Sequence, residues 1–230
     1  MSIYVGDKRY ASYIGDKRRK DIGSEGGSSS LPSGYTQVEY IESNTQPYMT
    51  TDYKPRNTDV ITVKFVLTVA PANANNYYVL FGSRNNALVT STENAWIGIN
   101  ASRQLFVRFG TVNISQTITL SLNTEYTAII DLVNCSITIA GNSYSFAGSN
   151  VNPSRSVYIS KMNASDVLGT AGTARYLAFE VKRNGAQYIN YVPAKVTDEA
   201  GNKGGFYDTV NQNFKRSALS SHEYTAGPAV

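Results

Sequence analysis

The stretch DVITVKFVLTVA (59–70) decides the fold class, because apolar side chains occupy every second position along it. Ile61, Val63, Phe65, Leu67 and Val69 fall on one face of an extended chain. A period of two is typical of a strand that lays one face on a hydrophobic core. The stretch therefore predicts a half-buried strand with these five side chains inside.

Short runs with the same alternation continue from Gly34 to the C-terminus, separated by Gly, Asn, Asp or Pro. In YTQVEYIES (35–43) we expect Tyr35, Gln37, Glu39 and Ile41 to share one strand face. Many short strands without a convincing amphipathic helix predict an all-β fold. We expect a two-sheet antiparallel jelly-roll sandwich whose apolar faces meet between the sheets.

The composition of the 230-residue chain agrees with this fold class, with 41% hydrophobic and 17% charged residues. A core is possible, and the surface must be largely neutral and polar. Ser, Thr, Asn and Tyr suit pleated strands and turns. The length allows one large domain with an appendage.

Charge and rare residues exclude several function classes. The net charge is +4, and no basic stripe alternates with aromatic residues, so we expect no nucleic-acid binding. The single cysteine, Cys135 in AIIDLVNCSITI (128–139), excludes a disulfide within the chain and is expected to be a small buried hydrophobe on a strand. The single histidine, His222, leaves His-rich metal sites without ligands. We expect no cofactor and no metal.

The N-terminus contains one phrase twice, as YVGDKR (4–9) and YIGDKR (13–18), and SEGGSSSL (24–31) follows. This predicts a duplicated docking segment (1–23), a Gly/Ser linker (24–31) and a folded domain (32–230). The N-terminus lacks the apolar stretch of a secretory signal. The sequence also contains no run of about eighteen apolar residues, the length that could cross a membrane. We therefore expect synthesis in a cytoplasm, no export by the usual route and no membrane insertion.

The repeated phrase has the composition of a docking peptide, with apolar anchors followed by basic residues. Such a peptide can add strands to the sheet edge of a partner. The expected docking residues are Tyr4, Val5, Lys8, Arg9, Tyr13, Ile14, Lys17 and Arg18. The alternative is an unstructured, solvated basic tail. Against it, disordered tails rarely repeat Tyr, Val and Ile in one frame.

Both ends of the domain resemble a known family. LPSGYTQVEYIESNTQPYMTTDYKP (31–55) and the closing segment from YVPAK to AGPAV (191–230) resemble concanavalin A-like, LamG-type jelly-roll domains of gut bacterial surface proteins and their phages. The resemblance implies that the first and last strands lie side by side. It also implies that GGFYDTVNQNF (204–214) forms a turn, a strand and an Asn-bearing turn that orients Tyr207 and Phe214. A binding role for Tyr207 or Asp208 is the alternative.

Jelly-roll lectins grip sugars with an aromatic plate and amide groups. Trp96 in TENAWIGIN (92–100) is the candidate plate, with Tyr77, Tyr78, Arg84 and Asn85 at the edges of Asn-rich loops. The alternatives are that Trp96 packs in the core and that the loops are simple hairpin turns.

Enzymatic and calcium sites lack their residue patterns. Glycoside hydrolases of this sandwich need paired carboxylates, as in E-x-D-x-x-E, and that spacing is absent. Glu39 and Glu42 are expected on opposite faces of one strand. Asp166, the one acid of ASDVLGTAGTAR (164–175), is too few for a calcium site. We therefore expect a non-enzymatic protein, although distant carboxylates of a hydrolase could converge in space.

The doubled phrase also resembles N-terminal segments of phage tail and fibre proteins. The expected function is a phage virion structural protein, a head or tail fibre or decoration protein, made in the host cytoplasm and exposed on the particle. Its N-terminus would dock on capsid, portal or tail proteins, and its lectin-like domain, as a homotrimer, would bind host-surface glycans. The alternatives are a purely structural virion jelly roll and a bacterial surface carbohydrate-binding adhesin.

Overall fold

The structure is a computed structural model of the chain and describes residues 31–44, 47–72, 77–84, 91–146, 150–164 and 172–230. Residues Leu31–Val230 form one compact unit. The expected docking segment (1–23), and all of the expected linker except Leu31, lie outside the described residues, as do Asn85 and Asp166.

The described ranges contain two β-sheets and no helix, so the prediction of an all-β, two-sheet fold is confirmed. The larger sheet contains β1 (Tyr35–Gln37), β2 (Ile41–Glu42), β4 (Asp59–Val69), β9 (Glu125–Asp131), β10 (Ser136–Ile139), β11 (Asn142–Ser145), β14 (Thr173–Arg183), β15 (Ala186–Val196), β16 (Lys203–Asp208), β17 (Asn213–Lys215) and β18 (Tyr224–Ala226). The smaller sheet contains β3 (Met49–Thr50), β5 (Tyr78–Ser83), β6 (Ala95–Ile99), β7 (Gln104–Phe109), β8 (Val112–Thr119), β12 (Tyr158–Ile159) and β13 (Met162–Asn163).

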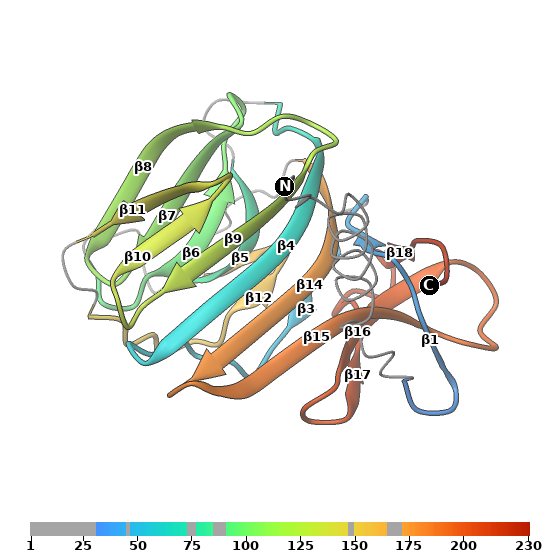
Figure 1. Ribbon diagram of the computed structural model, residues 1–230. Helices are drawn as coiled ribbons and strands as arrows, with labels where there is room; N and C mark the ends of the chain where they lie inside the picture. Colours follow the sequence, from blue (N-terminus) through green and yellow to red (C-terminus); the bar gives the residue numbers. More distant parts are fainter. Residues whose placement is uncertain (1–30, 45–46, 73–76, 85–90, 147–149, 165–171) are drawn as a thin grey trace, which may run out of the picture. The chain divides into compact units, whose positions relative to one another are not determined.

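The two sheets pack as a sandwich, an architecture compatible with a jelly roll (Figure 1). The larger sheet has the order β1-β15-β16-β18-β2-β14-β4-β9-β10-β11, with β17 beside β16. The smaller sheet has the order β3-β12-β5-β6-β7-β8. The pairings between named strands are antiparallel except for β13, which runs parallel to β5. In Figure 1, β4, β9, β14 and β15 lie side by side in one layer.

The core lies between the sheets and is formed by side chains of both. From the larger sheet it takes Ile61, Val63, Phe65, Leu67, Ile130, Tyr176, Phe179 and Val181; from the smaller, Leu80, Phe81, Ile97, Ile99, Val107 and Phe109. Each of these side chains is at most 1% exposed. The period of two predicts that each strand buries its apolar face between the sheets, and burial of this apolar surface stabilises the fold.

The stretch 59–70 forms β4, and four of its five predicted core residues are fully buried. The expectation for the fifth is wrong, because Val69 is 54% exposed. Thr173 pairs with Val69 and Ala174 with Leu67, so Thr68 is an extra residue in the ladder. Such a bulge shifts the alternation by one position, and the side chain that follows it leaves the core face.

The stretch 35–43 does not form the single strand that its alternation predicts. It divides into β1, which pairs with β15, and β2, which pairs with β14 and β18. Val38, Ile41 and Ser43 are the buried residues there, and Glu39 is exposed. The chain exchanges one partner strand for others at 38–40, so no single face persists from Tyr35 to Ile41. Glu39 therefore lies between strands rather than on a face opposite Glu42.

Cys135 lies in a turn and not on a strand as expected. The turn joins β9 to β10, and Asp131 closes it: its Oδ1 accepts hydrogen bonds from the main-chain N–H groups of Val133, at 3.0 Å, and Asn134, at 2.8 Å. Cys135 has a left-handed φ of 51° and is partly exposed. The carboxylate makes an Asx turn, which interrupts the apolar alternation of the sequence.

The two ends of the domain lie side by side, as the resemblance implies. β18 pairs with β2, and Val38 forms a bridge with Ala229. The closing motif forms β16, a turn and β17, with Tyr207 opposite Phe214. Tyr35 packs on both rings, with centroid distances of 5.0 and 5.1 Å. Tyr207 is 4% exposed, in agreement with the structural role expected for it.

A chain of buried hydroxyl groups joins the sheets through the core. The Tyr78 hydroxyl lies 2.6 Å from Ser43 Oγ and 2.9 Å from the Tyr176 hydroxyl, which belongs to the other sheet. The Tyr224 hydroxyl donates to Ser160 Oγ at 3.0 Å. Burial raises the pKa of Tyr78, Tyr176 and Tyr224. These hydroxyls stay protonated and satisfy one another, as buried polar groups must.

Candidate functional site

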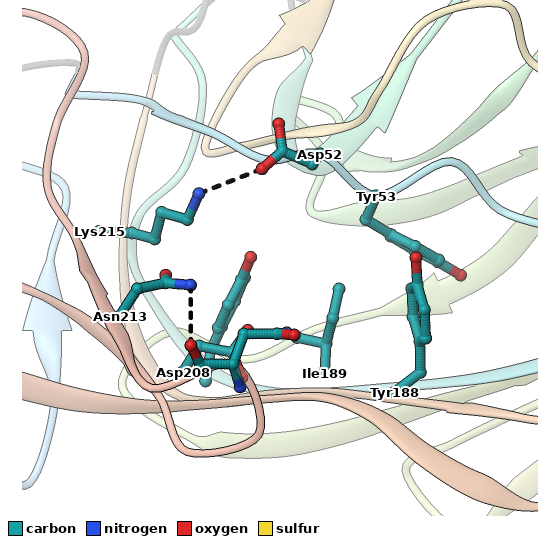
Figure 2. Close-up of a pocket in the computed structure, with 9 residues that line it drawn as sticks. Asp52, Tyr53, Tyr188, Ile189, Asp208, Asn213 and Lys215 are labelled. Atoms are coloured by element: carbon teal, nitrogen blue, oxygen red, sulfur yellow. Dashed lines mark hydrogen bonds and ion pairs between the residues drawn. The ribbon is translucent and has the colours of Figure 1, made fainter.

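A hollow of about 240 Å³ opens at the junction of β15, the β16–β17 hairpin and the segment 51–55 that leads into β4 (Figure 2). We call it the β15–β17 hollow. Its lining combines three tyrosines with acidic, amide and ammonium groups: Asp52, Tyr53, Tyr188, Ile189, Tyr191, Asp208, Asn211, Asn213 and Lys215.

Asp208 lines the hollow on the side of the β16–β17 hairpin, and its carboxylate stabilises the turn that follows β16. Oδ1 accepts from the main-chain N–H groups of Val210, at 3.0 Å, and Asn211, at 3.3 Å, and Oδ2 accepts from Asn211 Nδ2 at 2.6 Å. Asp208 is 1% exposed. The Asx turn of the sequence DTVN therefore returns the chain into β17 and places Asn213 and Lys215 at the hollow.

A buried ion pair holds the opposite wall. Asp59 accepts from Arg183 Nε at 2.8 Å and from Nη2 at 2.9 Å, and the Tyr53 hydroxyl donates to the same carboxylate at 2.9 Å. Burial, followed by the charge of Asp59, raises the pKa of Tyr53 well above its usual value. The Arg183 guanidinium also lies 4.2 Å from the centre of the Tyr188 ring. Tyr53, Asp59 and Arg183 are therefore joined by charge-assisted hydrogen bonds, which are stronger than neutral ones.

A β-bulge directs Tyr188 to the hollow. Gln187 pairs with Lys182 and Ile189 with Val181, so Tyr188 is the extra residue of β15. Tyr188 is 40% exposed, and its ring centroid lies 6.2 Å from that of Tyr53. Bulges commonly re-aim a side chain at functional sites. The result is an aromatic face that is open to solvent beside polar groups.

The mouth of the hollow carries an ion pair between Lys215 and Asp52. Lys215 Nζ lies 3.3 Å from Asp52 Oδ2. A dashed line marks this ion pair in Figure 2. The Asp52 side chain is 99% exposed, and that of Lys215 is 27% exposed. An exposed pair at this distance contributes less than about 1 kcal/mol, so a ligand can open it at little cost.

Several polar atoms in the hollow lack partners among the described residues. Asn213 Oδ1 is buried there and accepts no hydrogen bond. Within the same ranges, no hydrogen bond of the Tyr188 or Tyr191 hydroxyl is found. Burial, followed by the charges of Asp208 and Asp52, raises the pKa of Tyr191, so its hydroxyl remains a donor. A buried acceptor without a partner costs free energy that a donating ligand group recovers.

The geometry of the hollow suits reversible binding of a small, hydroxyl-rich molecule. An aromatic face, acceptors on Asp52 and Asn213, and a donor on Lys215 converge in one small space. Ligand sites typically combine such apolar rings with a few polar groups of this kind. Asp208 already accepts its hydrogen bonds from the turn, and Asp52 is therefore the carboxylate of the hollow that faces a ligand.

The structure brings Trp96 and Tyr77 together, but away from the β15–β17 hollow. They belong to a second apolar cluster on the smaller sheet, with ring centroids 5.7 Å apart. Phe106 lies 4.9 Å from Tyr77, and the Arg108 guanidinium lies 5.2 Å from the Trp96 ring. Trp96 is 2% exposed, which agrees with the alternative that it packs in the interior.

Among the other predicted sugar contacts, Tyr78 belongs to the main core and not to this second cluster. Tyr78 points into the main core and belongs to the hydroxyl chain described above. Arg84 is 8% exposed, and its main-chain N–H donates to Asn163 O at 3.0 Å. Asn85 lies outside the described residues, together with all eight predicted docking residues, and these predictions stay untested.

Sequence reasoning missed the β15–β17 hollow, apart from naming Asp208 as a minority binding candidate. The segment that carries Asp52 and Tyr53 lies more than a hundred residues before β15 and the β16–β17 hairpin, and 163 residues separate Asp52 from Lys215. One local signal was present, since YINY (188–191) places two tyrosines close together on a strand. No local sequence pattern predicts that Asp52 lines the same hollow as these two tyrosines.

Within the ranges that the structure describes, no group of three or more His, Cys, Asp or Glu side chains is placed to hold a metal ion. The same ranges contain no helix long and apolar enough to cross a membrane. No protein-family model matches the chain, and no curated protein matches it. The chain is an all-β, two-sheet sandwich with a polar, tyrosine-lined hollow at one end of its larger sheet.

Proposed function

We propose that this chain is a non-enzymatic virion protein of a phage, a head or tail fibre or decoration protein. Its N-terminal segment would dock on capsid, portal or tail proteins, and its sandwich, a concanavalin A-like jelly roll, would bind glycans on the host surface as a homotrimer. Synthesis in the host cytoplasm and exposure on the particle follow from that role. The resemblance of both domain ends to gut bacterial and phage jelly rolls supports this assignment.

The observation that carries the glycan-binding part is the β15–β17 hollow. A sugar presents C–H groups on one face and hydroxyls around its edge. An open Tyr188 ring beside Asp52, Asn213 and Lys215 offers partners for both. Two carboxylates line the hollow, and Asp208 accepts its hydrogen bonds from the turn, which leaves Asp52 without the second carboxylate that glycoside hydrolysis uses; this supports binding rather than hydrolysis.

The test of glycan binding is a glycan array probed with the full chain and with Tyr188→Ala. We expect specific glycans to bind the full chain and to lose binding in the variant. Val133→Ala is the matched control, because Val133 is an exposed apolar side chain, 58% exposed, in the β9–β10 turn. An array without any specific glycan would favour the purely structural virion role, and turnover of soluble β-glucans would favour a hydrolase.

The test of docking is deletion of residues 1–23. We expect the shortened protein to remain folded and to be lost from purified particles, with the full chain as control. Incorporation of the shortened protein at the normal level would contradict the docking role. An image of the particle that locates the chain would identify the partner protein.

A further inference from the structure

We propose that the β15–β17 hollow selects uncharged sugars, and that a vicinal diol of the terminal sugar bridges Asp52 and Lys215. This inference rests on the proposed glycan-binding function and names its ligand class. It starts from the Lys215 Nζ–Asp52 Oδ2 distance of 3.3 Å at the mouth. One hydroxyl can donate to the carboxylate while its neighbour accepts from the ammonium, so both charges keep a partner.

A charged sugar cannot satisfy both members of this pair. The carboxylate of a uronic acid would form an ion pair with Lys215 but would lie close to the like-charged carboxylates of Asp52 and Asp208, which both line the hollow. An amino sugar would bond to Asp52 and stand against Lys215. In either case the charge of the sugar lies beside a like charge of the hollow, and like charges placed next to each other disfavour binding. The arrangement therefore discriminates against both signs of charge.

The interior of the hollow provides the remaining contacts. Asn213 Oδ1 is buried and accepts no hydrogen bond from any described residue, so it can accept from a further hydroxyl. Tyr188 is 40% exposed, and its ring can pack against the C–H face of a pyranose. Arg183 holds that ring from outside, 4.2 Å from its centre.

The size of the hollow limits the ligand to a single sugar residue. Its volume of about 240 Å³ is below the ~300–1,000 Å³ of pockets that bury drug-sized ligands. A single bound residue implies recognition of the end of a glycan chain. Weak, single-residue contacts suit a protein that binds through several copies.

The experiment uses the full chain with labelled isoleucine methyl groups, because Ile189 lines the hollow and reports on it directly. Methyl shifts are titrated with a hexose, its uronic acid and its 2-amino sugar, each as the methyl glycoside, in the gluco, galacto and manno series. Ile137, buried in β10, is the internal reference. We expect the uncharged hexose of at least one series to shift Ile189 and to bind about tenfold more tightly than its charged relatives.

Two variants test the bridging pair. Lys215→Met is expected to weaken binding of the hexose about tenfold, because one hydrogen bond to a charged group is lost. Asp52→Asn is expected to relax the discrimination against the uronic acid, because Lys215 loses its competing partner. Lys64→Met is the matched control: Lys64 forms an ion pair with Glu125 at 2.8 Å on the exposed face of β4, and its loss leaves binding unchanged.

The outcomes separate this inference from the proposed function. A uronic acid or amino sugar that binds more tightly than its parent hexose would overturn the selectivity and leave glycan binding intact. Equal loss in Lys215→Met and Lys64→Met would overturn the bridging role of Lys215. If no monosaccharide shifts Ile189 while the array shows specific glycans, the site assignment is wrong. An empty array would overturn the glycan-binding function itself.

Discussion

Arg183 is the residue on which one wall of the hollow depends. It holds the fully buried carboxylate of Asp59 with two hydrogen bonds and lies against the rings of Tyr53 and Tyr188. The pair connects the start of β4 to the end of β14. Removing one member of a buried pair leaves the other charge desolvated and unpaired.

We therefore expect Arg183→Ala to lower the free energy of unfolding by about 3–5 kcal/mol. Urea denaturation measures this change. Lys64→Ala is the control, since the Lys64–Glu125 pair is 41% and 50% exposed and its loss should cost less than about 1 kcal/mol. Equal effects of the two substitutions would contradict the role of Arg183.

Buried tyrosines give the stability of the protein a definite pH dependence. Burial raises the pKa of Tyr53, Tyr78, Tyr176, Tyr191 and Tyr224 above the value of the unfolded chain. Above pH ~10 the unfolded chain loses these protons while the folded chain keeps them. The unfolded state then binds fewer protons, so the free energy of unfolding falls as pH rises.

The stabilisation is complete below pH ~10 and is lost progressively above it, by up to about 1.4 kcal/mol per pH unit for each buried tyrosine. Urea denaturation at several pH values above and below 10 measures this slope. Absorbance of tyrosinate shows which rings ionise, and circular dichroism shows whether the sheets persist. Ionisation of every tyrosine with the sheets intact would contradict the prediction.

At the scale of elements, the β16–β17 hairpin positions the groups that face a ligand. The Asx turn of Asp208 reverses the chain, and Gly205 lets β17 lie close to β16. A Cβ atom at position 205 would lie 2.3 Å from the carbonyl oxygen of Lys215 and 2.8 Å from Phe214 Cζ. Backbone cannot move aside without separating the two strands.

We expect Gly205→Ala to destabilise the protein by about 1–3 kcal/mol and to weaken sugar binding, because it displaces Lys215 and Asn213. Thermal unfolding and the Ile189 methyl titration measure the two effects. Ser220→Ala, at an exposed position in the following loop, is the control. Unchanged binding in Gly205→Ala would show that the hairpin does not position the site.

The strands also show which features the sequence predicts and which depend on pairing. The alternation of 59–70 predicted β4 and four of its core residues, because burial of alternate positions is a property of one strand. The error at Val69 comes from a bulge at Thr68, which depends on the pairing with β14. Tyr188 reaches the hollow through a bulge in the same way, opposite Val181 and Lys182.

At the scale of the molecule, the two ends of the domain close the larger sheet together. β18 lies between β16 and β2, and Tyr224 is fully buried beneath it. Among the described residues, the main core cluster extends from Val38 to Ala226. The last strand is therefore part of the core rather than an appendage.

We expect a chain that starts at Leu31 to unfold within about 2 °C of the full chain, a change of less than about 1 kcal/mol. Removal of Tyr224–Val230 should instead cost at least about 3 kcal/mol, through loss of a buried aromatic side chain and two strand pairings. Differential scanning calorimetry compares the three chains. A large loss on removing residues 1–30 would show that the sandwich depends on them.

The sequence by itself determined the fold class and the position of β4, because both follow from the alternation of residues close together in the chain. Only the tertiary structure decided where a binding site lies. Asp52 and Lys215 are 163 residues apart, and Trp96, the strongest local candidate, is buried. The physical reason is register: bulges and strand order determine which side chains meet, and those depend on pairing between distant segments.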